Sequence, residues 1–218
     1  MQFSQCTEVS LPQEKAPLSP EVNKLSSLVQ KFPFSAEELG VWYGSITNYA
    51  FWAKRFAEDH DPSKIIGQDN LLRYRPHRDM CIRIQSQDSP MDLLRSLAAA
   101  LSCGAKITVS WSDAFSHVHL KDQLHDFTGN FSFVQETEEQ FCRSIKRRKY
   151  RRVRLLSSPD ERMLEAASHS ATFLDSTPVL SHGRFELLHY LREISFSIDY
   201  HRYGNLGLRE KEERKPLL

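Results

Sequence analysis

Glycine is scarce in this sequence, with eight residues among 218. Neither the GxGxxG pattern of dinucleotide-binding folds nor the GxxxxGK[ST] pattern of P-loops occurs. Both patterns need glycines, because the backbone must turn tightly and approach the phosphates closely. The sequence therefore predicts no phosphate-cradling loop, and we assign no cofactor to the chain.

A membrane-spanning run and an excess of one charge are also missing. No stretch approaches the roughly 18 consecutive apolar residues that a transmembrane helix needs. The formal net charge of +1 gives no general attraction to nucleic acid or to anionic membranes. Residues 1–22 lack the charged-then-apolar order of a signal peptide. We therefore expect a cytoplasmic protein with no membrane partner.

Cysteine pairs of the CxxC type are absent as well. The four cysteines are irregularly spaced: Cys6, Cys81, Cys103 and Cys142. This pattern indicates reduced thiols in a cytoplasmic protein rather than a disulfide framework. Cys103 lies at a predicted helix end, but no recognisable pattern ties a histidine to it. We assign no catalytic residue.

The N-terminal part divides into an arm and a helical segment. Residues 1–20 are rich in Pro, Ser, Gln and Glu, which is typical of a flexible arm, and residues 21–62 form the helical segment. There, Pro20 stands near the start of a short helix, and Ser35 and Glu38 fit a capping box. Apolar residues then recur every three or four positions to about Asp59: Leu39, Trp42, Ile46, Tyr49, Ala53 and Phe56. This stripe predicts a long helix packed on the rest of the fold, or else a self-association face.

Strands and helices alternate in the remainder of the chain. Residues 71–76 and 79–85 have strand character, and Ser89, Pro90 and Gly104 bound a helix. Further strands are predicted at 106–112, 131–137, 151–157, 171–176 and 178–180, and further helices at 137–145, 158–170 and 183–194. Thr137 should cap the first of these helices, and Ser158 with Pro159 should open the second. The alternation predicts an α/β, Rossmann-like fold with a mainly parallel sheet covered by helices.

Histidines gather near the middle of the chain. The sequence HVHL would place His117 and His119 on one face of a short strand, with His125 nearby. Two such histidines can share a metal ion, but no Cys, Asp or Glu set of recognisable spacing accompanies them. We interpret them as surface residues and assign no metal.

A basic run is the strongest charge feature. Eight of the twelve residues from Arg143 to Arg154 are Lys or Arg. Such a run can contact nucleic acid or act as a nuclear import signal. The preferred interpretation is a solvated helix end, favourable to the helix dipole, that leads into a strand carrying Val153 and Leu155 on its buried face. Nucleic acid is therefore an unlikely partner.

Three stretches resemble a known family. RPHRDMCIRIQSQDSPMDLLRSLAAALSCGAKITVSWS is similar to the opening of the cofactor domain in the aldehyde dehydrogenase superfamily. YAFWAKRFAEDHDPSKIIGQDNLLRYRP and GRFELLHYLREISFSIDYHRYGNLG resemble the C-terminal region of bifunctional enzymes that join proline dehydrogenase to L-glutamate γ-semialdehyde (1-pyrroline-5-carboxylate) dehydrogenase. The resemblance covers roughly residues 35–210, and it is weak from about 113 to 145.

The chain departs from that family at every catalytic position. Ser89 precedes Pro90 where the family has an Asn that holds the oxyanion, and Ser112 stands near the position of the cofactor-binding Lys. The glycine pair, the general-base Glu and the nucleophilic Cys in its Gly-Gln-x-Cys setting do not occur. The resemblance therefore implies a degenerate aldehyde-dehydrogenase-like domain whose isolated chain is inactive.

The resemblance also implies a role for such a domain. In long members of the family, the domain and its tail cover the tunnel between the active sites and help oligomers form. We accordingly expect a degenerate α/β domain at residues 63–195 and a docking tail at residues 196–218, with a structural role. The partner would be a second copy or a proline/pyrroline-5-carboxylate dehydrogenase chain. The expected docking residues are Tyr200, His201, Arg202, Tyr203 and Asn205. Packing of the tail on its own domain is the alternative.

Two other functions stay open from the sequence. One is an aldehyde dehydrogenase fragment that retains NAD binding and converts pyrroline-5-carboxylate to glutamate. The other is a nucleic-acid-binding module that uses Arg147, Arg148, Arg151 and Arg152, with Tyr150 stacking on a base.

Overall fold

The fold begins with two N-terminal helices. The computed structural model describes residues 16–65, 67–113, 118–124, 127, 129 and 131–199. Helix α1 spans Pro20–Val29 and helix α2 spans Ala36–Ala57. The predicted capping box at the start of α2 is confirmed, since the Ser35 hydroxyl accepts from the Glu38 amide and the Glu38 carboxylate accepts from the Ser35 amide.

A five-stranded sheet forms the centre of the molecule, and its strands run parallel in the order β4-β3-β2-β5-β6. The strands are β2 Met80–Ile84, β3 Ile107–Trp111, β4 Phe131–Gln135, β5 Arg152–Leu155 and β6 Phe173–Asp175. The predicted α/β, Rossmann-like class with an N-terminal helical segment is thus confirmed. Strand β2 is buried along its whole length, as expected for a strand covered on both faces.

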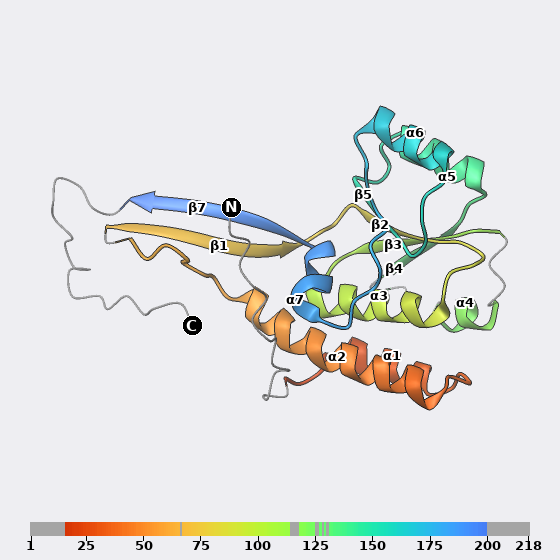
Figure 1. Ribbon diagram of the computed structural model, residues 1–218, viewed down its shortest axis with the longest axis horizontal. Coiled ribbons are helices and arrows are strands. Elements are labelled where there is room, and N and C mark those ends of the chain that lie inside the picture. The colour runs from red at the N-terminus through yellow and green to blue at the C-terminus, as the bar shows by residue number, and fades with distance from the viewer. Residues whose placement is uncertain are drawn as a thin grey trace, which may run out of the picture.

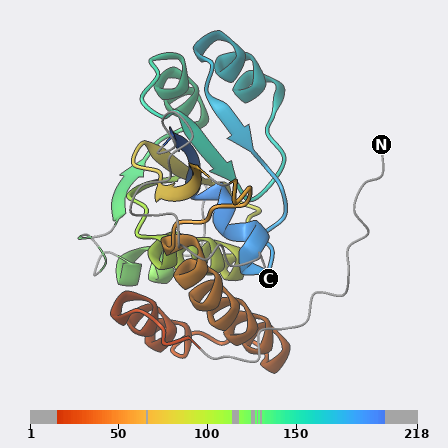
Figure 2. The same cartoon turned by 90° about the vertical axis from the view of Figure 1, so that its left-hand side faces the viewer.

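Helices cover both faces of this sheet (Figures 1 and 2). Helices α3 (Pro90–Cys103) and α4 (Val118–Leu124) lie on one face, with α1 and α2 forming a further layer beyond α3. Helices α5 (Glu138–Lys146) and α6 (Glu161–Ser170) lie on the other face. The apolar residues of the sheet therefore divide between two buried clusters.

The striped face of α2 packs into the larger cluster. Trp42, Ile46 and Tyr49 are fully buried, and Leu39, Ala53 and Phe56 pack against the same core. The interpretation of this stripe as a packing face is confirmed. The predicted ends of α3 are also confirmed: Ser89 caps it and Gly104 ends it in the left-handed conformation. Thr137 caps α5 as predicted.

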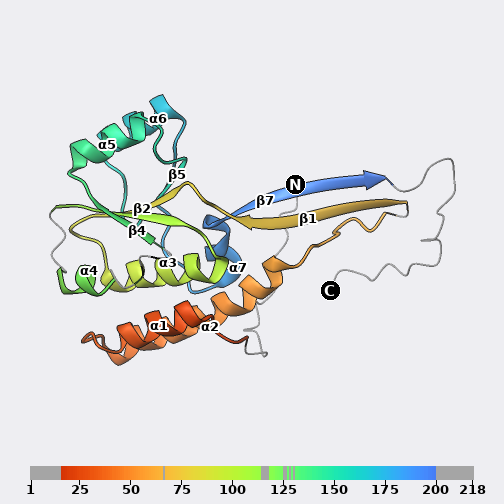
Figure 3. The same ribbon diagram turned by 180° about the vertical axis from the view of Figure 1, so that it is seen from behind.

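A separate two-stranded ribbon projects from this body (Figures 1 and 3). Strand β1 (Gln68–Pro76) pairs antiparallel with β7 (Leu191–Asp199) over their full lengths. The predicted helix at residues 183–194 is therefore wrong in its second half. Helix α7 covers only Gly183–Glu186, and a 3₁₀ turn follows at Leu187–His189. From Glu193 onward, polar and apolar residues alternate with the period of a strand, and β1 supplies the hydrogen-bond partners.

Three smaller predictions are also wrong. HVHL does not form a strand, because Val118–Leu124 is helical. Residues 178–180 form no strand; Pro178 has no amide hydrogen, and the Leu180 amide donates to the Glu186 carboxylate instead. Helix α6 begins at Glu161 rather than near Ser158, because the Asp160 carboxylate accepts from the Met163 amide and caps it.

Candidate functional site

The carboxyl edge of the sheet is where parallel α/β folds usually bind ligands. Carboxylates gather there: Asp88 and Asp92 flank the start of α3, and Glu136 follows β4. Both Asp88 and Glu136 are largely buried. Burial raises the pKa of Asp88 above its ordinary value. Asp92 is paired with Arg95 at 3.0 Å and Glu136 with Lys149 at 3.6 Å, and Ser112 directly follows β3 at this edge.

The three described cysteines have environments that disfavour nucleophilic attack. Cys81, Cys103 and Cys142 are free thiols, whereas Cys6 lies outside the described residues. Burial raises the pKa of all three described thiols, most strongly for Cys81 and Cys103. A raised thiol pKa disfavours the thiolate, which is the reactive form.

The side chains of the basic run do not share one exposed surface. Arg147, Arg148 and Arg151 are exposed, but Tyr150 is 3% exposed, and its hydroxyl lies 3.5 Å from a Glu136 carboxylate oxygen. The prediction that Tyr150 could stack on a base is wrong, because its ring is enclosed beside Phe141. The histidine hypothesis finds no support either: the described residues contain no metal-ligating group of three, and His117 and His125 are outside them.

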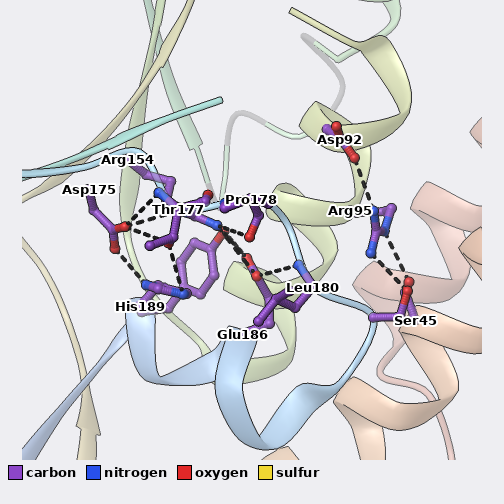
Figure 4. Close-up of polar contacts among 12 residues, drawn as sticks. Ser45, Asp92, Arg95, Arg154, Asp175, Thr177, Pro178, Leu180, Glu186 and His189 are labelled. Atoms are coloured by element: carbon purple, nitrogen blue, oxygen red, sulfur yellow. Dashed lines mark hydrogen bonds and ion pairs between the residues drawn. The ribbon is translucent and has the colours of Figure 1, made fainter. Parts of the chain in front are cut away.

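A cluster of buried charges lies between the sheet and α7 (Figure 4). The Arg154 side chain on β5 is completely buried, and it contacts two buried carboxylates. Its Nη1 lies 3.1 Å from Asp175 Oδ1, and its Nη2 lies 3.3 Å from Glu186 Oε1. Nη1 also donates to the Thr177 carbonyl oxygen at 2.7 Å. Arginine suits such a site because one planar group serves several acceptors.

Both carboxylates have further partners. His189 Nδ1 lies 2.5 Å from Asp175 Oδ2, and the Thr177 hydroxyl donates to Asp175 Oδ1 at 2.7 Å. Burial alone would raise the pKa of Asp175, but the hydrogen bonds from His189 and Thr177 and the nearby positive charges hold it well below its ordinary value. Glu186 accepts from the Tyr190 hydroxyl at 3.1 Å. The cluster is thus an ion-pair network in which both Nη atoms of Arg154 have partners, whereas its buried Nε has none among the described residues.

This network fixes the start of the ribbon. Glu186, His189 and Tyr190 directly precede Leu191, where β7 begins, so Arg154 ties the root of β7 to the sheet. The N-terminal helices add further ties. The Asn48 side chain accepts from the Gly183 amide at 2.5 Å. The Arg95 guanidinium donates to the Ser45 hydroxyl at 3.0 Å (Figure 4) and to the Ser181 hydroxyl at 2.9 Å.

The two faces of the ribbon differ in chemistry. Side chains alternate along a strand, so Leu71, Ile194, Phe196 and Ile198 share one face with Asp69 and Arg73. The Arg73 guanidinium lies 5.3 Å from the centroid of the Phe196 ring. Phe196 and Ile198 are 40% and 52% exposed. The other face carries polar cross-strand pairs, among them Gln68 with Asp199, Asn70 with Ser197 and Tyr74 with Glu193. The ribbon therefore presents an apolar face at its outer half.

The two outer edges of the ribbon also differ. On the β1 side, Leu72 exchanges both backbone hydrogen bonds with His60, at 2.6 and 2.9 Å. On the β7 side, the described residues supply no further strand, since the sheet has the order β1-β7 only. The predicted docking residues Tyr200, His201, Arg202, Tyr203 and Asn205 follow β7 directly and lie outside the described residues.

The sequence patterns predict neither the Arg154 cluster nor the ribbon. Arg154 was counted within a solvated basic run, although its neighbours Val153 and Leu155 are apolar, which is an available signal for a buried strand. Its partners Asp175 and Glu186 are 21 and 32 residues away, at no recognisable spacing.

Comparison with known proteins finds similar folds among solved structures. No family model and no curated protein sequence matches the chain. Proline utilization A from Corynebacterium freiburgense matches with a TM-score of 0.56 and 19% identity over 91% of this chain and 16% of that one. Proline utilization A from Bdellovibrio bacteriovorus matches with a TM-score of 0.50 and 14% identity over 70% of this chain and 18% of that one. Lactaldehyde dehydrogenase from Escherichia coli has a TM-score of 0.47 and 17% identity over 70% and 37% of the two chains.

The chain has an aldehyde dehydrogenase-like α/β fold. More narrowly, its fold matches a part of proline utilization A, which confirms the resemblance at the level of the fold. The chain spans 16% and 18% of the lengths of the two proline utilization A chains. Within the described residues, no helix has both the length and the apolar character to cross a membrane.

Proposed function

We propose that this chain is a non-catalytic assembly module related to the pyrroline-5-carboxylate dehydrogenases of proline catabolism. The β1–β7 ribbon would dock on a second copy by pairing along the outer edge of β7. The observation that carries the proposal is that no described strand pairs with β7 on the side away from β1. An unpaired strand edge offers a row of backbone donors and acceptors to another chain.

The geometry of Leu72 indicates which groups of β7 are open. In an antiparallel pair, residues whose backbone groups face the partner strand alternate with residues whose groups point outward. Leu72 bonds to His60, on the side away from β7, so its neighbour across the ribbon, Ser195, points outward as well. By alternation, the backbone groups of Glu193 and Ser197 also point toward the open edge.

The apolar face of the ribbon supports the same proposal. An isolated two-stranded ribbon is at best marginally stable in water. Phe196 and Ile198 expose large apolar side chains near its outer end, and a second ribbon would cover part of that surface. Self-association is therefore preferred over docking on a separate dehydrogenase chain, although covering of a tunnel in such a chain is the other structural role that the resemblance implies.

Three observations on catalytic groups support the non-catalytic part of the proposal. The sequence lacks the nucleophilic Cys motif, the described thiols have raised pKa values, and carboxylates occupy the sheet edge that would meet a cofactor. We infer a cytoplasmic location from the free cysteines. We also retain the proposed division into 1–20, 21–62, 63–195 and 196–218, and note that β7 runs across the last boundary.

Ser197→Pro tests the edge pairing directly. Proline removes the outward amide hydrogen of residue 197 and is tolerated at a strand edge, so the β1–β7 pairing should survive. The matched control is Ser197→Ala, which also loses the hydroxyl bond to Asn70 but keeps the amide hydrogen. Light scattering should show an assembly for the wild type and for Ser197→Ala, and a monomer for Ser197→Pro. A monomeric wild type, or equal masses for all three, would contradict self-association through β7.

A further inference from the structure

A basic cavity lies at the opposite end of the sheet from the expected cofactor edge. It has a volume of about 350 Å³. Its walls come from the amino-terminal ends of β2, β5 and β6 and from the roots of the two ribbon strands. The residues that determine its chemistry are His77, Arg78, Arg151, Arg152, Phe173 and Arg192. Cavities of this size hold small ligands.

Positive charge is in clear excess in this cavity. Four arginines line it, and Asp79 is the one carboxylate among the lining residues. Within the described part of the chain, none of the four arginines forms an ion pair. Asp175 acts on Arg152 at longer range, but its carboxylate is already engaged by Arg154 and His189. Among the described residues, the cavity thus holds four arginines against one lining carboxylate, that of Asp79.

The walls are held in place by backbone bonds. The His77 amide donates to the Tyr190 carbonyl at 2.9 Å, and its carbonyl accepts from the Lys106 amide at 3.3 Å. The Arg151 carbonyl accepts from the Phe173 amide at 3.0 Å. These bonds connect five separate parts of the chain near the opening, so the cavity is formed before any ligand binds.

Arg152 is the most enclosed of the four arginines. Its guanidinium lies 4.3 Å from the centroid of the Phe173 ring, and its Nη1 is buried without a hydrogen-bond partner among the described residues. Burial and the charge of Arg154 lower its pKa, and burial with the charges of Arg152 and Arg192 lowers the pKa of His77. A buried donor without a partner is costly and is usually satisfied by water or a ligand.

We propose that this cavity binds a small anion that carries at least two phosphate or carboxylate groups. Arginine presents paired N–H donors that match both groups, and the partial burial of Arg152 strengthens such bonds. One anionic group would meet Arg152, and a second would meet the exposed pair Arg151 and Arg192 at the mouth. This inference does not rest on the proposed assembly through β7.

Calorimetric titration of the full chain with pyrophosphate and, separately, with citrate tests the proposal. The test variant combines Arg151→Gln with Arg192→Gln, because both side chains are exposed and their loss should leave the fold intact. The control is Arg147→Gln, which makes the same change in the same basic run but outside the cavity. Far-ultraviolet circular dichroism checks the fold of each variant.

We expect at least one of the two anions to bind the wild type and the control with equal affinity, and to bind the double variant about tenfold or more weakly, which corresponds to at least about 1.4 kcal/mol. Preference for pyrophosphate would identify the ligand as a phosphate compound, and preference for citrate would identify a polycarboxylate. Absence of binding by both anions, or equal weakening in the control and the double variant, would overturn the proposal.

Discussion

Arg154 shows how a single buried charge depends on its partners. The residue is completely enclosed, and it meets Asp175 and Glu186, which are themselves buried. Removing the guanidinium leaves two carboxylates in a poorly solvated site. The cost of breaking such a group by removing one partner is about 3–5 kcal/mol. We therefore expect Arg154→Met to lower the free energy of unfolding by that amount in urea denaturation.

The matched control for this variant is Arg151→Met. Arg151 directly precedes β5, three residues before Arg154, but it is exposed and forms no ion pair within the described residues. Surface changes of this kind usually alter stability by less than about 0.5 kcal/mol. A loss below about 1 kcal/mol for Arg154→Met would show that the cluster is not held as described.

Asp175 gives the same cluster a pH dependence. Its folded-state pKa lies below its unfolded value of about 3.9, because hydrogen bonds and positive charges outweigh the effect of burial. The stability that it contributes is therefore present above about pH 4 and is lost as the pH falls through the folded-state pKa. We expect the melting temperature to fall steeply below pH 4 in the wild type. The drop should be shallower in Asp175→Asn, which starts from a lower stability at pH 7.

Residues that act locally were predictable, and residues that act at long range were not. Ser35, Ser89 and Thr137 cap their helices through bonds to amides three residues away, so the sequence pattern contains all the information. Arg154 and Asp175 meet only because the sheet brings their strands together. No spacing rule connects them, and the charge of Arg154 alone indicated a solvent-exposed position.

At the scale of elements, the C-terminal ribbon was the largest departure from prediction. The α/β alternation between residues 80 and 175 could be predicted because each strand and helix carries its own period. Residues 183–194 contain apolar residues at spacings that suit either a helix or a strand. The choice is made by β1, which lies more than a hundred residues earlier in the chain and pairs with Leu191–Asp199. Single-sequence reasoning does not detect that pairing.

Gly183 is the point where α7 meets α2. A Cβ added there would lie 2.7 Å from the Asn48 carbonyl oxygen, which is backbone and moves only with the helix. We expect Gly183→Ala to destabilise the fold by about 1–3 kcal/mol, the usual range for overpacking. Denaturant unfolding measures this change.

Gly40→Ala serves as the contrasting variant. Gly40 lies within α2, and a Cβ there would meet nothing within 4 Å. Alanine should stabilise this helix by about 0.5–1 kcal/mol, because glycine is the poorer helix former. If both variants shifted stability in the same direction, the close contact between α7 and α2 would be in doubt.

At the scale of the whole molecule, the layered body works as a platform for the ribbon. The Arg154 cluster holds the root of β7 to the sheet, and α2 holds α7 through Asn48 and Gly183. The ribbon then extends away from the body (Figure 3), and no described strand pairs with the outer edge of β7. A rigid root and an open edge are what an assembly element requires, since a strand fixed in advance loses less conformational entropy on binding.

Residue-resolved amide hydrogen exchange along β7, in a concentrated sample of the wild type, tests the central claim most directly. If β7 pairs with a second copy, the outward amides of Ser195 and Ser197 should be protected to a similar degree as the inward amide of Phe196, and the protection should fall on dilution. Protection of Phe196 together with fast, concentration-independent exchange at Ser195 and Ser197 would contradict docking through this edge.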